Sequence, residues 1–210
     1  MKALVSLAAL LLFVTGCASL RVSSDVQAGR QALLVGKSEV ALSYFQRAAQ
    51  QDPNYYYGTA LRQGIWSYVG RSEYAMGQYP QARQTLEKAL SVDKNDNTAR
   101  LYLGLTLARS GDRQRGLTEI QSGMKGIHGF LEYVTEAFRF TFGQFWDPAR
   151  KIRTAIEADL TMISQREFDW DRLIADGEWL GKEIEEESDR ARSDETRQQS
   201  RENSGGEGRP

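Results

Sequence analysis

The sequence predicts an all-α fold, and its composition and hydrophobic pattern support this. Proline is scarce, with four residues in 210. No run of alternating β-branched residues indicates a sheet, whereas apolar residues recur at the spacing of helix faces along much of the chain. Apolar residues make up 40% and charged residues 26%, an ordinary mix for one globular domain with its own core. We therefore expect helices packed against helices.

The charge balance and the cysteine content narrow the expected partners and fold. The 27 lysines and arginines nearly match the 28 aspartates and glutamates, so we expect no nucleic-acid partner. Cys17 is the only cysteine, so no disulfide can form within the chain. The fold must then depend on its hydrophobic core.

The first residues have the organisation of a signal peptide. Lys2 supplies a short positive region, residues 3–14 are apolar apart from Ser6, and the small residues Thr15 and Gly16 follow. About 12 apolar residues are too few to span a hydrocarbon core of roughly 30 Å. We therefore expect residues 1–16 to be removed rather than to serve as an anchor helix.

The sequence Val14-Thr15-Gly16-Cys17 resembles the bacterial lipobox. This resemblance implies a lipoprotein, cleaved before Cys17, with a diacylglyceryl thioether on the sulfur and an acyl chain such as palmitate on the new amino group. Residues 17–22 would form a lipidated linker. Several acyl chains give firm attachment to a membrane, because each buried CH₂ contributes about 0.8 kcal/mol. The alternative is an ordinary secretory signal followed by an incidental cysteine.

The residue after the cysteine bears on localisation. By resemblance to the sorting rule of Gram-negative lipoproteins, Ala18 in place of aspartate favours the outer membrane. We therefore expect a cell-envelope protein that faces the periplasm from the outer membrane, in a host that has one.

Small, bulky and turn-forming residues recur in three successive stretches between residues 23 and 128. The three sets are Ala28-Gly29, Ala41, Phe45, Ala48 and Pro53; Trp66, Val69-Gly70, Ala82, Leu86 and Ala89; and Leu103-Gly104, Leu107, Gly116, Ile120 and Gly123. The small residues would let two antiparallel helices approach closely, and the bulky residues would fill the space between hairpins. Gly36, Gly77 and Gly111 fall at the expected turns, where a positive φ favours glycine.

These three sets resemble the tetratricopeptide (TPR) repeat, a helical hairpin of 34 residues. The resemblance implies a TPR-like helical-hairpin solenoid of about three repeats over residues 23–128, with additional C-terminal helices. The third copy departs most from the family pattern, because Gly116 and Gly123 replace alanine and His128 stands where proline is frequent.

The spacing between the first and second copies is irregular. Ala82 and Gly116 are 34 residues apart, but Ala41 and Ala82 are 41 apart. Seven extra residues correspond to two helical turns, which would keep the same face inward. We therefore predict that the first helix of the second repeat is extended at its N-terminus and begins at about Asn54.

The C-terminal part predicts further helices and then a disordered tail. Gly126 and Gly129 are expected to break the pattern before a helix over residues 130–142. Asp147-Pro148 predicts a helix start with a capping carboxylate and proline in the first helical position, and another helix is expected from Asp169. Residues 129–190 would thus pack on or extend the solenoid. The polar composition of residues 191–210 predicts disorder.

The sequence contains no catalytic or metal-binding motif, so we expect no enzyme, cofactor or metal. His128 is the only histidine and is interpreted as a polar loop residue. Glu183 and Glu185 to Glu187 are interpreted as a solvated helix end, with a weak divalent-cation site as the alternative. Residues 130–190 remain the place where an unrecognised active site could lie.

The repeat resemblance also implies a binding groove lined by the first helix of each hairpin. The family's groove positions correspond to Arg30, Leu33, Ser67, Arg71, Tyr74, Leu101, Leu105 and Arg109. Three arginines among apolar neighbours would suit an acidic segment or a C-terminal carboxylate. The alternative is that they are ordinary solvated arginines. Tyr55 to Tyr57 form a second candidate surface, or else pack in the core.

From these observations we expect a membrane-anchored periplasmic TPR scaffold that binds other proteins or peptides during envelope assembly, secretion or cell-wall maintenance. Two alternatives stay open. One is a structural scaffold that self-assembles into a homo-oligomer, and the other is the enzyme with a site in residues 130–190.

Overall fold

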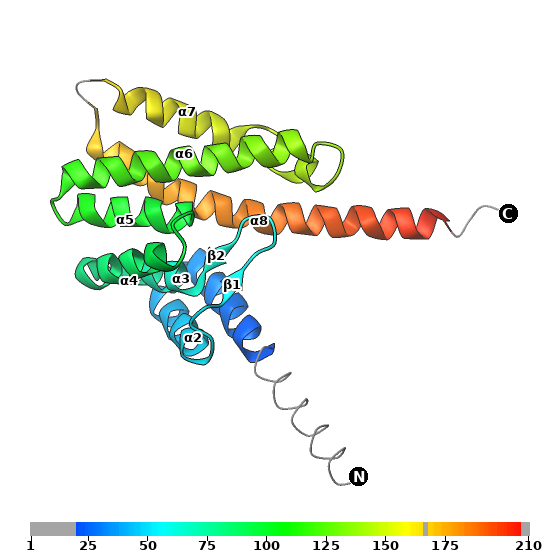
Figure 1. Cartoon of the computed structure of the whole chain (residues 1–210), viewed down its shortest axis with the longest axis horizontal. Helices are drawn as coiled ribbons and strands as arrows, with labels where there is room; N and C mark the ends of the chain where they lie inside the picture. Colours follow the sequence, from blue (N-terminus) through cyan, green and yellow to red (C-terminus); the bar gives the residue numbers. More distant parts are fainter. Residues whose placement is uncertain (1–19, 166–167, 207–210) are drawn as a thin grey trace, which may run out of the picture. The chain divides into compact units, whose positions relative to one another are not determined.

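The computed structural model describes residues 20–165 and 168–206, which are almost entirely helical (Figure 1). The chain divides into two compact units, Met1–Ala99 and Arg100–Pro210. The predicted signal peptide, Cys17 and Ala18 lie outside the described residues. Within the described ranges, no helix has the length and apolar character needed to cross a membrane.

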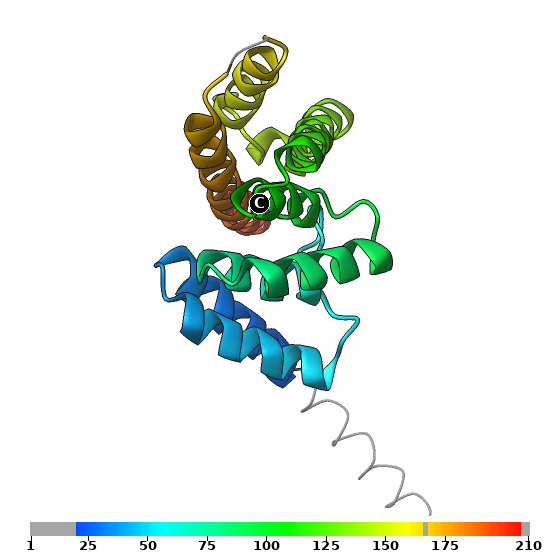
Figure 2. The ribbon, with the colours of Figure 1, turned by 90° about the vertical axis from the view of Figure 1, so that its left-hand side faces the viewer.

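The first unit contains two helical hairpins. One pairs a helix over residues 20–34 with α2 (Ser38–Gln51), and the other pairs α3 (Ile65–Ala75) with α4 (Tyr79–Val92). The two helices of each hairpin lie side by side in Figures 1 and 2, and α2 also packs against α3. Gly36 and Gly77 occupy the two hairpin turns with φ of 77° and 73°, as predicted.

In each hairpin of the first unit, the two helices are in close contact where a glycine on one helix faces a large side chain on the other. A Cβ on Gly29 would lie 2.7 Å from the ring of Phe45, and a Cβ on Gly70 would lie 2.6 Å from Cγ of Leu86. Phe45 and Leu86 are fully buried. The small and bulky residues therefore have the packing roles predicted for them.

The connection between these hairpins differs from the prediction. Residues 54–64 do not extend a helix: β1 (Tyr56–Tyr57) pairs antiparallel with β2 (Gln63–Gly64), and α3 begins only at Ile65. Gly58 explains the difference, because its φ of 97° is incompatible with a right-handed helix. A Cβ at this position would also lie 2.0 Å from the carbonyl oxygen of Leu61, so the loop closes too tightly for any other residue.

The second unit begins within α5 (Asn97–Arg109) and continues with α6 (Arg113–Ala137). The motif glycine Gly104, and Gly116, which stands where the repeat pattern has alanine, lie where these two helices meet. A Cβ on Gly104 would lie 2.5 Å from the backbone nitrogen of Ile120, and one on Gly116 would lie 2.8 Å from that of Ala108. The two helices are so close that neither position has room for a side chain.

The predicted break in α6 is absent, because the helix continues unbroken past Gly126 and Gly129. Its buried stripe keeps helical spacing across both glycines, through Ile120, Met124, Ile127, Leu131 and Val134. This continuous apolar face outweighs the low helix propensity of two glycines. The helix then ends at Ala137 rather than at 142, and a short 3₁₀ turn, η1, follows over Phe142–Phe145.

Two further helices complete the second unit: α7 (Lys151–Ile163) and α8 (Trp170–Gly206). α8 begins next to Asp169, as predicted, and Asp169 caps it, since its Oδ1 accepts hydrogen bonds from the backbone N–H groups of Asp171 and Arg172. Pro148 does not begin α7, which starts three residues later.

The predicted disorder of residues 191–210 is wrong for 191–206, which continue α8. Pairs of opposite charge one turn apart favour the helical state there. Arg197 lies 3.0 Å from Asp194 within this stretch, and directly before it Arg190 lies 3.6 Å from Glu186. Residues 207–210 lie outside the described part of the chain.

Candidate protein-binding surface

Two of the predicted groove arginines occupy equivalent places in the first unit. Arg30 directly follows Gly29, and Arg71 directly follows Gly70. These are the two glycines that face a large side chain of the other helix in their hairpin. Both side chains are almost completely buried, with 3% of each residue exposed. For these two of the three arginines, the alternative of an ordinary solvated side chain is therefore wrong.

Aromatic rings bring these two arginines into one cluster. The guanidinium of Arg30 lies 4.1 Å from the ring centroid of Tyr57, and that of Arg71 lies 5.3 Å from the centroid of Tyr68. The two tyrosine rings meet edge to face at 6.4 Å, and Tyr68 stacks on Phe45 at 5.0 Å. The tyrosine rings support the guanidinium groups of both arginines and restrict the orientation of their N–H donors.

The two short strands supply part of this cluster, which the sequence prediction missed. Gln63 on β2 is buried, and its Oε1 accepts a hydrogen bond of 2.8 Å from Nη1 of Arg71. Tyr57 on β1 is the buried member of the three consecutive tyrosines, while Tyr55 and Tyr56 are half-buried. The sequence predicted a helix over these residues instead of two strands, so neither Gln63 nor Tyr57 was predicted to contact the arginines.

Ser67 was predicted to line the groove but is fully buried beside a buried carboxylate. Its Oγ lies 3.5 Å from Oδ1 of Asp96, which also accepts a hydrogen bond from the backbone N–H of Ala99. The other oxygen of Asp96 accepts from the N–H of Gly64. Burial raises the pKa of Asp96 to about 6 despite these donors. Ser67 and Asp96 therefore fix the starts of α3 and α5 rather than offering a surface to a ligand.

Two other predicted positions of the first unit serve packing. The ring of Tyr74 is buried and lies 5.7 Å from that of Tyr79, across the turn between α3 and α4. Leu33 is half-buried against the core of the first hairpin. Neither is a freely exposed groove residue in this structure.

The predicted positions of the third repeat are covered within the second unit. Leu101 and Leu105 are fully buried. A Cβ on Gly177 of α8 would lie 2.9 Å from Cδ2 of Leu105, so α8 packs directly on this face of α5. Arg109 remains exposed and lies 2.9 Å from Glu178 of α8. The expectation that these leucines line an open groove is therefore not met.

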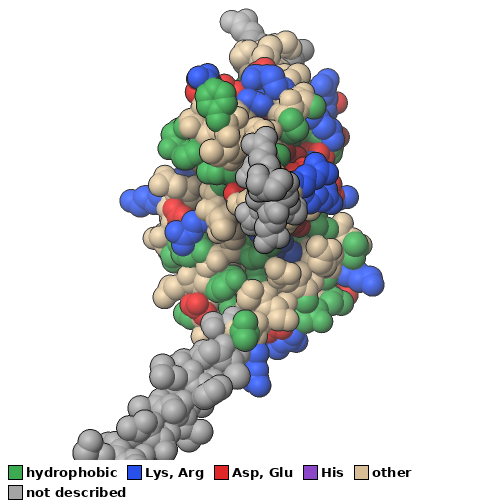
Figure 3. All heavy atoms as spheres, turned by 90° about the vertical axis from the view of Figure 1, so that its right-hand side faces the viewer, with side chains coloured by type: hydrophobic (Ala, Val, Ile, Leu, Met, Phe, Trp, Pro, Cys, Tyr) green, Lys and Arg blue, Asp and Glu red, His purple; other side chains and the backbone are tan. Residues whose placement is uncertain are grey.

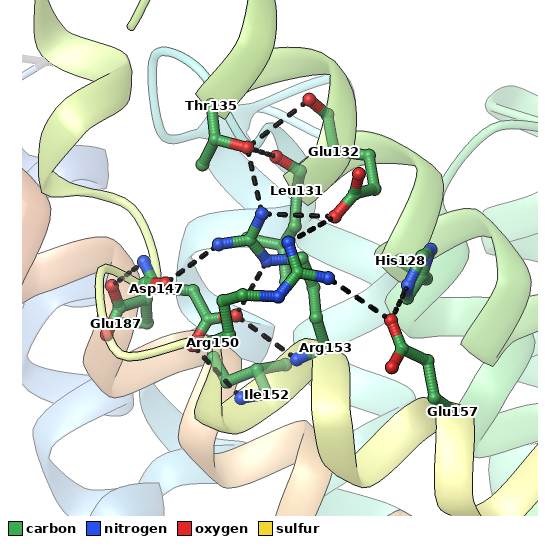
Figure 4. Close-up of polar contacts among 10 residues, drawn as sticks. All are labelled: His128, Leu131, Glu132, Thr135, Asp147, Arg150, Ile152, Arg153, Glu157 and Glu187. Carbon is green, nitrogen blue, oxygen red and sulfur yellow. Dashed lines mark hydrogen bonds and ion pairs between the residues drawn. The ribbon is translucent and has the colours of Figure 1, made fainter.

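An ionic cluster in the second unit joins α6, α7 and α8 (Figure 4). At its centre Arg153 donates from Nε to Asp147 and from Nη1 to Glu132 and to the hydroxyl of Thr135. The hydrogen bond from Arg153 lowers the pKa of Glu132. Asp147, whose φ is 42°, is held by its backbone N–H, which donates to Glu187.

Asp147 also confirms the predicted capping carboxylate. Its two oxygens accept hydrogen bonds of 3.0 and 3.1 Å from the backbone N–H groups of Ile152 and Arg153, at the start of α7. The residue thus joins a helix cap to a buried ion pair with the Arg153 side chain. This double use explains why the carboxylate is buried.

His128 lies at the edge of the ionic cluster, on α6 rather than in the predicted loop. Its Nε2 lies 3.0 Å from Glu157, which also pairs with Arg150 at 3.3 Å. The hydrogen bond with His128 lowers the pKa of Glu157. No serine, threonine or cysteine accompanies His128 in these contacts, and the arrangement suits a tie between helices better than a catalytic pair.

The acidic stretch of α8 is not the solvated helix end that the sequence predicted. Glu183, Glu185 and Glu187 are buried. Burial alone would raise the pKa of Glu183, but hydrogen bonds from Lys151 and Arg190 outweigh it and lower the pKa. In residues 20–165 and 168–206, no group of three or more His, Cys, Asp or Glu side chains could hold a metal ion.

Charges of both signs are interspersed with hydrophobic side chains on the face drawn in Figure 3. This pattern agrees with the near balance of charge in the sequence.

Comparison with known families supports the repeat assignment. Residues 70–111 match the TPR repeat, from the middle of α3 through α4 and α5. No curated protein matches the chain at a significant level. TPR repeats generally mediate protein binding and are typically non-catalytic. The chain is therefore an all-α protein of packed helical hairpins that contains a TPR repeat in residues 70–111.

Proposed function

We propose that this protein is a scaffold that binds partner proteins at the cell envelope, to which lipid on Cys17 tethers it. The observation that carries the proposal is the TPR repeat together with the pair of arginines on successive first helices of the first unit. The partner would present an acidic segment or a C-terminal carboxylate to Arg30 and Arg71.

The chemistry of the cluster supports this class of ligand. A carboxylate can accept two parallel hydrogen bonds from one guanidinium group, and such charge-assisted bonds are strongest where water is excluded. Tyr57 and Tyr68 hold the two guanidinium groups against ring faces. Because both arginines are buried, a ligand must displace the groups that cover them before it can bind.

The tether and the localisation rest on sequence alone. Val14-Thr15-Gly16-Cys17 resembles a lipobox, and Ala18 favours the outer membrane. A scaffold held there by several acyl chains would keep its partners at the periplasmic face, where envelope assembly, secretion or cell-wall maintenance takes place.

Fractionation tests the tether. We expect the wild-type chain to sediment with membranes and to incorporate labelled palmitate, and Cys17→Ser to appear as an unprocessed or soluble form. A Cys17→Ser variant that fractionates with membranes as the wild type does would show that the anchor assignment is wrong.

Co-purification tests the binding function. The mature chain, cross-linked in intact cells, should retain at least one envelope protein that the Arg30→Ala/Arg71→Ala variant loses. Arg47→Ala/Arg83→Ala is the matched control, because both arginines lie in the same unit in exposed ion pairs. Sedimentation adds a second criterion: a large homo-oligomer that retains no other protein would instead favour a self-assembling structural scaffold.

A further inference from the structure

The helix α8 lies directly on one face of α5, the first helix of the third hairpin. A Cβ on Gly177 would lie 2.9 Å from Cδ2 of Leu105, and a Cβ on Gly181 would lie 2.5 Å from the ring of Tyr102. The two glycines are one helical turn apart, so they form a flat strip along which the α8 backbone meets these side chains. A larger residue at Gly177 would force the Leu105 side chain to move, and one at Gly181 would force the ring of Tyr102 out of its place.

An ion pair fixes the register of this contact. Glu178 of α8 lies 2.9 Å from Arg109 of α5, with about two fifths of each side chain exposed. Tyr102 faces Gly181, whereas Leu105 and Arg109 face Gly177 and Glu178, so the two helices run antiparallel. An exposed ion pair adds little stability but distinguishes one register from another.

The covered face is the one that TPR resemblance assigns to ligands. Leu101, Leu105 and Arg109 are the positions of the third repeat that correspond to the family's groove, and two of them contact α8. α8 therefore occupies the place of a helical ligand within its own unit.

The composition of α8 indicates a helix that depends on this contact. Glycine is the least favourable residue other than proline inside a helix, and α8 has two of them in its first four turns. Its buried positions also include Glu183 and Glu187 beside the apolar Leu180 and Ile184. Both carboxylates are paired, Glu183 with Lys151 and Arg190 and Glu187 with Arg190. Because such pairs must be desolvated on burial, they stabilise docking less than apolar contacts of similar size, so a better ligand can compete with α8.

We propose that α8 is an internal ligand of the α5 face and that a partner helix binds by displacing it. The partner would be an amphipathic helix with two small residues four apart and an acidic residue directly after the first, as in Gly177-Glu178-Trp179-Leu180-Gly181. This inference rests on the proposed binding function and specifies a second binding face and its regulation.

A peptide binding assay with the full mature chain, carrying Cys17→Ser, tests the internal contact without any partner. The probe is a labelled peptide of residues 170–190. We expect the chain with native α8 to bind it undetectably, and Gly181→Leu, whose α8 cannot seat on Tyr102, to bind at least tenfold more tightly. Ala175→Leu, on the exposed face of α8, is the matched control and should behave as the chain with native α8 does. A control peptide with leucine in place of Gly177 and Gly181 should bind neither the chain with native α8 nor either variant.

A second variant covers the case in which Gly181→Leu does not fold. Glu178→Lys reverses the charge at one end of an exposed ion pair and should raise peptide affinity several-fold through repulsion from Arg109. If neither Gly181→Leu nor Glu178→Lys binds the peptide better than the chain with native α8, α8 is a fixed part of the fold and the proposal fails.

An experiment with a co-purified partner tests the α5 face separately from the Arg30–Arg71 cluster. A co-purified partner that uses the α5 face should bind Glu178→Lys more tightly in competition with the peptide. A partner that binds Glu178→Lys and the chain with native α8 equally would overturn displacement. The peptide assay still decides whether α8 is displaceable, and the Arg30→Ala/Arg71→Ala variant still decides whether the arginine cluster binds a partner.

Discussion

In the first unit the helices of each hairpin meet where a glycine on one faces a large apolar side chain on the other, as Gly29 faces Phe45. In the second unit such contacts recur, as where Gly177 faces Leu105, but a buried ion pair of Arg153 with Asp147 adds a second kind of interaction between the helices. The difference teaches that one chain can build similar helical packing from two kinds of interaction. Apolar interlocking follows a sequence motif, whereas buried ion pairs follow only from the three-dimensional arrangement.

Phe45→Ala should have the largest effect on stability. The ring is fully buried, stacks on Tyr68 and fills the space over Gly29, so its removal leaves a cavity in the first unit. We expect a loss of about 3–5 kcal/mol in the free energy of unfolding, as for other Phe-to-Ala core changes. Urea denaturation followed by circular dichroism measures it. Exposed Gln46→Ala is the control, and a loss at Phe45 no larger than that of the control would break the comparison.

Arg153→Met should destabilise the second unit by about 3 kcal/mol, because it leaves the buried carboxylate of Asp147 without its cation. The same denaturation experiment tests this, with Arg139→Met as control. The pair of Arg139 with Glu136 is exposed and 4.0 Å long, so its loss should cost under about 1 kcal/mol. Equal effects of the two substitutions would show that the ionic cluster does not hold the helices.

The sequence predicted the parts of the fold that repeat and missed those that do not. Glycine turns and small-to-large contacts have a fixed spacing, so all three hairpins could be placed, and the TPR repeat in residues 70–111 was found. The seven extra residues between the first and second copies are compatible with either a longer helix or a strand pair. Their number alone therefore could not predict the strands around Gly58. The unbroken α6 and the helical residues 191–206 were missed for a related reason, since packing and pairs of charge outweigh local propensity there.

The candidate site shows the same limit. Arg30 and Arg71 could be selected from their place after a motif glycine, but nothing in the sequence indicates that Tyr57, Tyr68 and Gln63 surround them. Leu105 is covered by a helix some 70 residues further along the chain. Residue-by-residue transfer from a repeat family cannot reveal a segment that the family pattern does not contain.

Asp159→Asn should produce the smallest stability effect and a characteristic pH dependence. Burial, followed by the neighbouring carboxyl of Asp176, raises the pKa of Asp159 to about 7 from an ordinary value of 3.8. The folded chain therefore binds a proton more tightly than the unfolded chain, and stability is lost as the pH rises from about 4 to about 7. We expect Asp159→Asn to gain on the order of 1 kcal/mol over the wild type at pH 8 and to match it near pH 4.

Denaturation across this pH range, compared with exposed Asp171→Asn, checks the prediction. Asp96, whose pKa is raised to about 6 by burial, adds a similar slope to every variant, so the difference between variant and wild type is the informative quantity. A difference that stays constant from pH 4 to pH 8 would contradict the account of Asp159 and Asp176.

Titration of a purified, co-isolated partner against the mature chain tests most directly the claim that the Arg30–Arg71 cluster binds protein ligands. Arg30→Ala/Arg71→Ala should weaken binding at least tenfold, because charge-assisted hydrogen bonds shielded from water contribute about 1.5–3 kcal/mol each. The control Arg47→Ala/Arg83→Ala should bind as the wild type does, and circular dichroism should show all three chains equally folded. Unchanged affinity in the folded Arg30→Ala/Arg71→Ala variant would contradict the proposed site.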